Sequence, residues 1–75
     1  MTEHQLGMIL KDMYENAPKG FHVAQIHHFG VKYAEVIISN DYKAKDIIRE
    51  SGLNASYATE LSKGIKLSKY VVSKQ

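Results

Sequence analysis

The stretch that decides the fold is residues 45–64, which read KDIIRESGLNASYATELSKG. Ile47 and Ile48 mark the buried side of a short helix, together with Ala44 just before the stretch. Gly52 follows where that helix should end, and a glycine there can take the left-handed backbone conformation of a sharp turn. The pattern therefore predicts a helix that is followed at once by a tight turn.

The second helix of the pair should begin at Asn54, whose side chain can cap it, and should end at Gly64. Ala58 and Leu61 are spaced to form its inner face, anchored on the first helix, so the other side chains point outward. These outward side chains are the candidate binding residues. They are Asn54, Ala55, Ser56, Tyr57, Thr59, Glu60 and Lys63.

This segment resembles the helix-turn-helix of phage-repressor-like DNA-binding proteins, as a motif over about residues 43–64. Ile47, Gly52, Leu53 and Asn54 stand in the places of the first-helix apolar residue, the turn glycine, the following aliphatic residue and the capping residue. The resemblance implies a small bacterial or phage transcriptional regulator that binds double-stranded DNA sequence-specifically. It also implies a homodimer, because most domains of this type read palindromic half-sites.

On this resemblance the second helix is the recognition helix. Asn54, Ser56 and Thr59 would bond phosphates or base edges, Tyr57 would offer its hydroxyl to the DNA backbone or its ring to a thymine methyl, and Glu60 would accept from a cytosine amino group. The alternative is structural. Asn54 and Ser56 would then only cap the second helix, Tyr57 would pack against its own domain, and the outward face would simply be solvated.

Charge is distributed unevenly along the chain. Residues 1–40 carry a net charge of −1 and residues 41–75 carry +3. No acidic residue follows Glu60, whereas four lysines do: Lys63, Lys66, Lys69 and Lys74. If this tail lies beside the recognition helix, we expect the lysines to attract phosphates non-specifically. A solvated lysine tail is the alternative.

The first forty residues predict two helical segments. Thr2 and Gln5 fit a capping box at the start of a helix. This helix should stop at Ala17, because Pro18 disfavours a helical backbone conformation for the residue before it. Residues 21–37 then have helical spacing of apolar side chains, either as one helix of some sixteen residues or as two short helices around Gly30.

The remaining segments predict a break and an ambiguous end. Residues 39–41, Ser-Asn-Asp, are polar and contain good capping residues, so the second segment should stop there. Residues 65–72 mix alternating apolar residues with a β-branched pair, which suits either a strand or a final helical turn.

Length and composition predict one domain over residues 1–75. With 75 residues, of which 44% are hydrophobic and 24% charged, the chain is typical of a small globular domain with one core. The fold class we expect is all-α, a compact bundle of four or five short helices that contains the helix-turn-helix. The chain has no cysteine and no apolar run of about 18 residues, so we expect a cytoplasmic protein without a membrane anchor.

The sequence offers no catalytic or cofactor site. His22, His27 and His28 lie close together, but no carboxylate stands at ligand spacing beside them, so we expect no metal. No nucleophile-and-base pair, phosphate-cradling glycine loop or carboxylate dyad can be found. We therefore expect neither an enzyme, nor a cofactor, nor a small-molecule substrate.

A second function remains open from the sequence. The chain could be a protein-interaction module with a helix-turn-helix-like shape and no DNA binding. Its partner would then bind an exposed apolar patch formed by Phe21, Val31, Tyr33, Ile37 or Tyr70. A polar outward face over residues 54–63 that lies beside the lysine tail would favour DNA.

Overall fold

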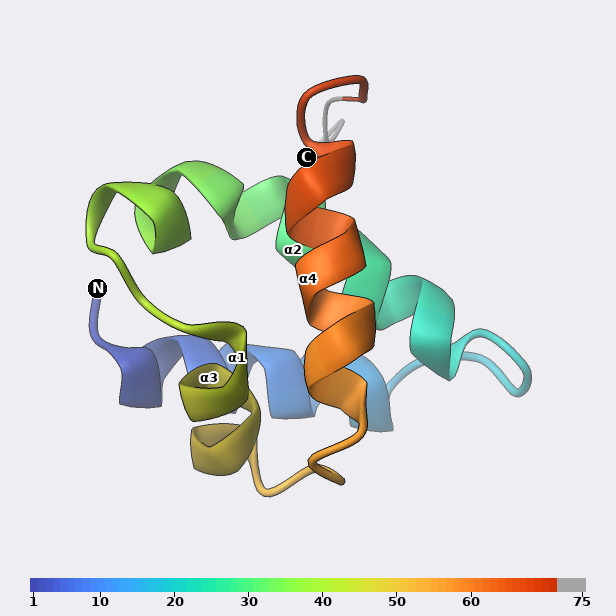
Figure 1. Cartoon of the computed structure of the whole chain (residues 1–75). Coiled ribbons are helices and arrows are strands. Elements are labelled where there is room, and N and C mark those ends of the chain that lie inside the picture. The colour runs from blue at the N-terminus through green and yellow to red at the C-terminus, as the bar shows by residue number, and fades with distance from the viewer. Residues whose placement is uncertain (72–75) are drawn as a thin grey trace.

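Four helices make up residues 1–71, which are the part of the chain that the computed structural model describes (Figure 1). They are α1 (Glu3–Glu15), α2 (His22–Ser39), α3 (Ala44–Ser51) and α4 (Tyr57–Leu67). The prediction of an all-α bundle is confirmed. None of these helices is both long and apolar enough to cross a lipid bilayer.

Helix α1 begins with the predicted capping box. The Thr2 side chain accepts from the Gln5 backbone N–H at 3.1 Å, and the Gln5 side chain accepts from the Thr2 N–H at 2.8 Å. The helix ends at Glu15 and not at Ala17 as expected. The Asn16 N–H still donates to the Asp12 carbonyl at 3.0 Å, but the Ala17 N–H donates to the Tyr14 carbonyl at 3.3 Å, so the regular helical pattern is lost there.

Helix α2 is one continuous helix of 18 residues, so of the two arrangements left open by the sequence the single helix is correct. Gly30 lies inside it and is buried. The predicted break after it is present: Asn40 donates from its side chain to the Val36 carbonyl at 2.8 Å, and Asp41 takes a positive φ of 56°.

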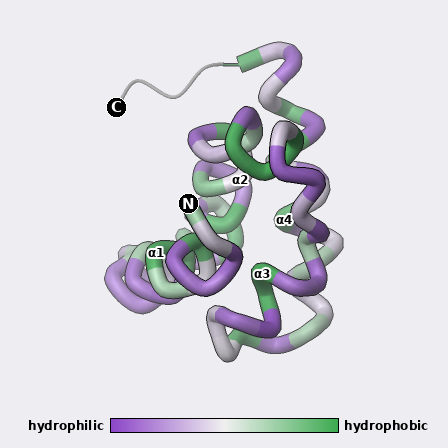
Figure 2. The backbone as a smooth tube through the Cα atoms, turned by 90° about the vertical axis from the view of Figure 1, so that its left-hand side faces the viewer, coloured by the Kyte–Doolittle hydropathy of each residue, from purple (hydrophilic) through white to green (hydrophobic). Residues whose placement is uncertain are grey.

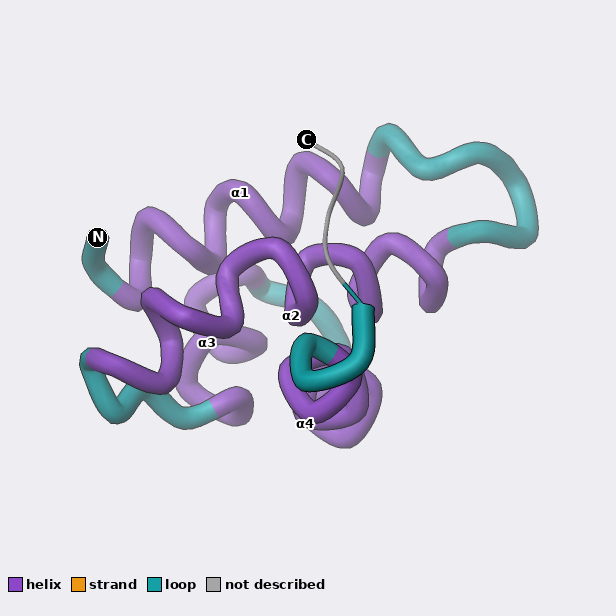
Figure 3. The backbone as a smooth tube through the Cα atoms, turned by 90° about the horizontal axis from the view of Figure 1, so that it is seen from above, coloured by secondary structure: helices purple, strands orange, loops and turns teal. Residues whose placement is uncertain are grey.

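The helices pack in two layers that cross. Helix α1 contacts both α2 and α3, whereas α4 packs mainly against α2 and less extensively against α3. Figure 3 shows α4 almost end-on, standing across the long axes of α1 and α2. One side of α4 is therefore held by α2, and much of the rest faces solvent.

A single core joins all four helices. Each helix carries both hydrophobic and hydrophilic residues (Figure 2). The fully buried side chains of the core are Leu6, Leu10, Ile26, Phe29, Ile37, Ile47, Ile48 and Leu61. Every helix contributes at least one of them, so residues 1–71 form one packed unit.

Two helix crossings are so close that they need glycine. At the crossing of α1 and α3, a Cβ on Gly7 would lie 2.8 Å from the Ser51 backbone nitrogen. At the crossing of α2 and α4, a Cβ on Gly30 would lie 2.8 Å from the Gly64 carbonyl carbon, and a Cβ on Gly64 would lie 2.6 Å from the His27 carbonyl oxygen. Gly30 and Gly64 therefore set how closely α4 packs on α2.

The prediction that Gly64 terminates the last helix is wrong. Gly64 is buried in the middle of α4, and the helix continues to Leu67. A turn follows, with the Tyr70 N–H donating to the Leu67 carbonyl at 2.9 Å. Of the two structures considered for residues 65–72, the helical one therefore applies as far as Leu67; residues 68–70 form a turn, and Val72 lies outside the described residues.

Candidate nucleic-acid interface

The turn between α3 and α4 is built around Gly52. Its φ of 78° places it in the left-handed region, and its N–H donates to the Arg49 carbonyl at 3.2 Å. Ser51, which is buried, donates its hydroxyl to the Ile48 carbonyl at 2.6 Å and accepts from the Leu53 N–H at 3.1 Å. The predicted helix end and glycine turn are confirmed, and the serine fixes the direction in which the chain leaves α3.

The entry into α4 differs in detail from the prediction. The Asn54 side-chain oxygen accepts from the Ser56 N–H at 2.9 Å, so Asn54 caps the turn over residues 55–56. Regular helix begins only at Tyr57. The prediction that Asn54 caps this helix is therefore wrong: the N-cap is Ser56, which has no side-chain capping bond, and Asn54 stabilises the turn before it.

Most of the predicted site residues lie on the surface of this unit. Thr59, Lys63 and Lys66 are exposed and recur at the spacing that puts them on one face of α4. The full exposed set consists of Asn54, Ala55, Ser56, Thr59, Lys63, Lys66 and Lys69. The structure therefore brings the lysines beside the outward residues of α4, while Lys74 lies outside the described residues.

The prediction that Tyr57 points outward is wrong. Its hydroxyl lies 2.9 Å from the hydroxyl of Tyr14 on α1, and the two rings contact at 5.4 Å between centroids. The Tyr14 ring also contacts His22 at 4.9 Å. The hydrogen bond to Tyr57 raises the pKa of Tyr14 above its ordinary value. Tyr57 thus joins the start of α4 to α1 and packs within its own domain.

Glu60 also points away from the outward face. Its Oε1 accepts from His27 Nε2 on α2 at 2.8 Å, and its Oε2 lies 3.5 Å from Lys63 Nζ. The sequence-based prediction had Glu60 facing outward over the bases. The charge that would have repelled phosphates is instead turned toward α2 and paired.

The pairing of Glu60 predicts a pH effect on stability. The hydrogen bond from His27, helped by the charge of Lys63 and opposed by partial burial, lowers the pKa of Glu60. A carboxyl whose pKa is lowered by folding stabilises the fold above its unfolded pKa of about 4.3, and this contribution is lost as pH falls through the folded value. Between about pH 6 and about pH 3, the wild type should lose more stability than Glu60→Gln.

Chemical denaturation at both pH values measures this difference. Glu15→Gln is the matched control, because Glu15 is exposed on α1 and makes no ion pair within residues 1–71. The control should follow the wild type at both pH values. An equal acid-induced loss in wild type and Glu60→Gln would contradict the role given to the His27 bond.

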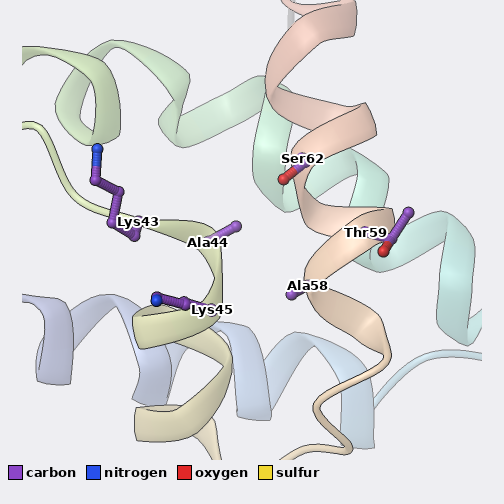
Figure 4. Close-up of a pocket in the computed structure, with 6 residues that line it drawn as sticks. All are labelled: Lys43, Ala44, Lys45, Ala58, Thr59 and Ser62. Atoms are coloured by element: carbon purple, nitrogen blue, oxygen red, sulfur yellow. The ribbon is translucent and has the colours of Figure 1, made fainter.

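A shallow concavity of about 370 Å³ lies between the start of α3 and the exposed face of α4. Figure 4 shows Ala44 and Ala58 facing one another across it, with the Ser62 hydroxyl beside them. Lys43 and Lys45 extend from the α3 side, away from α4. Small side chains thus line the opening, and lysines stand at its edge.

Lys43 and Lys45 are residues that sequence reasoning missed as site candidates. Lys45 makes no ion pair among residues 1–71, and Lys43 makes only an exposed contact with Asp41 at 3.3 Å. Their signal in the sequence was a pair of basic residues at the start of the first helix of the motif. Such a pair can contribute phosphate contacts where a helix N-terminus also favours anions.

A family model described as an HTH-like domain matches residues 2–74. The chain belongs to this family of HTH-like domains. No curated protein and no solved structure matches it. Helices α3 and α4 are joined through the left-handed Gly52, and their role as the helix-turn-helix unit of this domain stays a prediction. The phage-repressor-like type of that unit stays a prediction.

The apolar patch considered for a protein partner does not gather on the HTH-like domain as predicted. Ile37 is only 2% exposed and belongs to the core, so its place in that patch was wrong. Val31 and Tyr33 are partly buried. Phe21 and Tyr70 are 57% and 83% exposed, and they stand at the start of α2 and after the end of α4.

Proposed function

We propose that this HTH-like domain binds double-stranded DNA through the exposed face of α4, as a small bacterial or phage transcriptional regulator. The observation that carries the proposal is the composition of that face. Thr59, Lys63 and Lys66 share it, and the one acid of α4, Glu60, is turned toward α2 and paired there. A helix of this kind presents hydrogen-bonding groups and positive charge to a groove of the duplex.

The charges around the face support the same proposal. Lys45, Lys66 and Lys69 make no ion pair among residues 1–71, so phosphates would meet uncompensated cations at both ends of the unit. Asn54 uses its side-chain oxygen to cap the turn, which leaves its amide group to donate to a phosphate. Thr59, in the first turn of α4, is the candidate for base readout.

The quaternary state and location belong to the proposal as well. We infer a homodimer, because two copies of α4 about one helical turn of DNA apart would read a palindromic site. The small core of a 75-residue chain would also gain from a partner. The chain lacks cysteine, which suits a reducing cytoplasm. Sedimentation with and without DNA tests the dimer.

A selection from random duplexes tests sequence-specific binding. Thr59→Ala should weaken binding to the selected site by about 1–3 kcal/mol and change binding to an unrelated duplex little, because a lost base contact acts only at the specific site. Ser56→Ala should show the same asymmetry if its hydroxyl reaches a base. Affinities on both duplexes at one salt concentration measure it.

Tyr57→Ala is the informative control in this experiment. Because Tyr57 is bonded to Tyr14, its removal should lower the melting temperature instead of the sequence preference. If no duplex is preferred by the wild type, or if Thr59→Ala binds both duplexes like the wild type, the exposed face of α4 does not read DNA.

A further inference from the structure

A second concave site lies beyond the DNA-binding face, at the end of α4. It is a groove of about 340 Å³ between α4 and α2, and its walls come from His27, Lys63, Lys66, Leu67 and Tyr70. We call it the Tyr70 groove. It shares two lysines with the proposed DNA face but none of the hydroxyl-bearing residues of α4.

The floor of the Tyr70 groove is apolar. Leu67 is 42% exposed and Tyr70 is 83% exposed, so both side chains present hydrophobic surface to solvent. Tyr70 makes no hydrogen bond through its hydroxyl within residues 1–71. An apolar floor of this kind favours a hydrophobic side chain, whereas sugar and phosphate groups would gain little from it.

The rim of the groove is positively charged. Lys66 makes no ion pair among residues 1–71, and Lys63 contacts only Glu60 at 3.5 Å. The chain has no acid after Glu60 that could neutralise this end of α4. The imidazole of His27 is engaged by Glu60, so it forms a fixed wall. An occupant therefore needs negative charge beside an apolar group.

We propose that the Tyr70 groove docks a short acidic segment of a partner protein, with a bulky hydrophobic side chain on Leu67 and Tyr70 and carboxylates on Lys63 and Lys66. Charge complementarity at the rim and the apolar floor together select this chemistry. Given the proposed DNA binding, on which this consequence rests, the segment and DNA would compete for the same two lysines. A partner could then release the domain from DNA.

The test uses a fluorescein-labelled peptide of about a dozen residues in which Leu and Phe alternate with Asp and Glu, added to the full chain without DNA. Leu67→Ala combined with Tyr70→Ala should weaken binding about tenfold or more, because the apolar contact is lost. Lys66→Gln should also weaken it. Phe21→Ala, an exposed aromatic away from the groove, is the matched control and should bind like the wild type.

A second peptide, with Ser in place of Leu and Phe, separates docking from simple charge attraction and should bind much more weakly. Equal binding of both peptides, or unchanged binding by the Leu67 and Tyr70 variant, would overturn the proposal. Two further results would overturn it. In the first, no peptide binds and the Leu67 and Tyr70 variant dissociates a dimer that the wild type forms. In the second, no peptide binds and the same variant loses affinity for duplex DNA. Thermal melts of each variant confirm folding. Because the peptide assay contains no DNA, it can fail or succeed independently of the DNA-binding proposal.

Discussion

Gly64→Ala is expected to lower the free energy of unfolding by about 2–3 kcal/mol, because overpacking a close contact forces the backbone to shift. The added Cβ would meet the His27 carbonyl oxygen at 2.6 Å and the His27 Cα at 2.9 Å, which are backbone atoms that cannot rotate away. The better helix propensity of alanine offsets only about 1 kcal/mol of the clash. For a domain of this size the melting temperature should fall by about 10–20 °C.

Gly52→Ala is the matched control for this prediction. Gly52 has φ 78°, but nothing lies within 4 Å of the position of its Cβ. The substitution should therefore cost only the conformational penalty of about 1 kcal/mol for an alanine in the left-handed region. Gly30→Ala, across the same crossing, should behave like Gly64→Ala. A Gly64→Ala protein that melts at or above the wild-type temperature would show that α2 and α4 do not cross at these glycines.

Several local features of the helices could be predicted from sequence. The capping box of Thr2 and the end of α3 at Gly52 both depend on residues within a few positions of one another. Backbone preferences and capping bonds act over this range, so their signals are visible in a single sequence. The exposure of Thr59 and Lys63 follows from helical spacing within α4, which is also a local property of the sequence.

The features that were predicted wrongly depend on residues that are distant in the sequence. Tyr57 meets Tyr14 across 43 residues of sequence, and Glu60 meets His27 across 33. No pattern within α4 marks either side chain as turned inward. A glycine near the end of a helical pattern can either terminate the helix or allow a second helix to pack closely against it. Which role Gly64 has depends on where Gly30 lies in the fold.

Lys43 and Lys45 were missed for a related reason. In sequence they are two of several exposed lysines, and they lie before the stretch that defines the recognition helix. Only the packing of α3 beside α4 places them at the edge of the concavity lined by Ala58, Thr59 and Ser62. The extent of a charged surface therefore follows from tertiary structure more than from charge counts.

Removal of the lysines that follow Glu60 is expected to have the largest effect on DNA binding. Lys63, Lys66 and Lys69 are all exposed, along α4 and in the turn after it. If each neutralises one phosphate, replacing all three by alanine should flatten the slope of log affinity against log salt by about 2.7, at about 0.9 per released counterion. At about 0.1 M salt this corresponds to a loss of roughly 10²–10³-fold on every duplex alike.

The chain contains a matched control for this experiment. Lys11, Lys19 and Lys32 are also exposed, and their replacement by alanine removes the same charge from residues 1–40. If binding depends on a defined face, this second triple variant should keep nearly the full salt slope, whereas a general attraction of a basic protein to DNA would weaken equally in both. Equal slopes for the wild type and the Lys63, Lys66 and Lys69 variant would remove the end of α4 from the interface. The concavity beside Lys43 and Lys45 would then be the next surface to substitute.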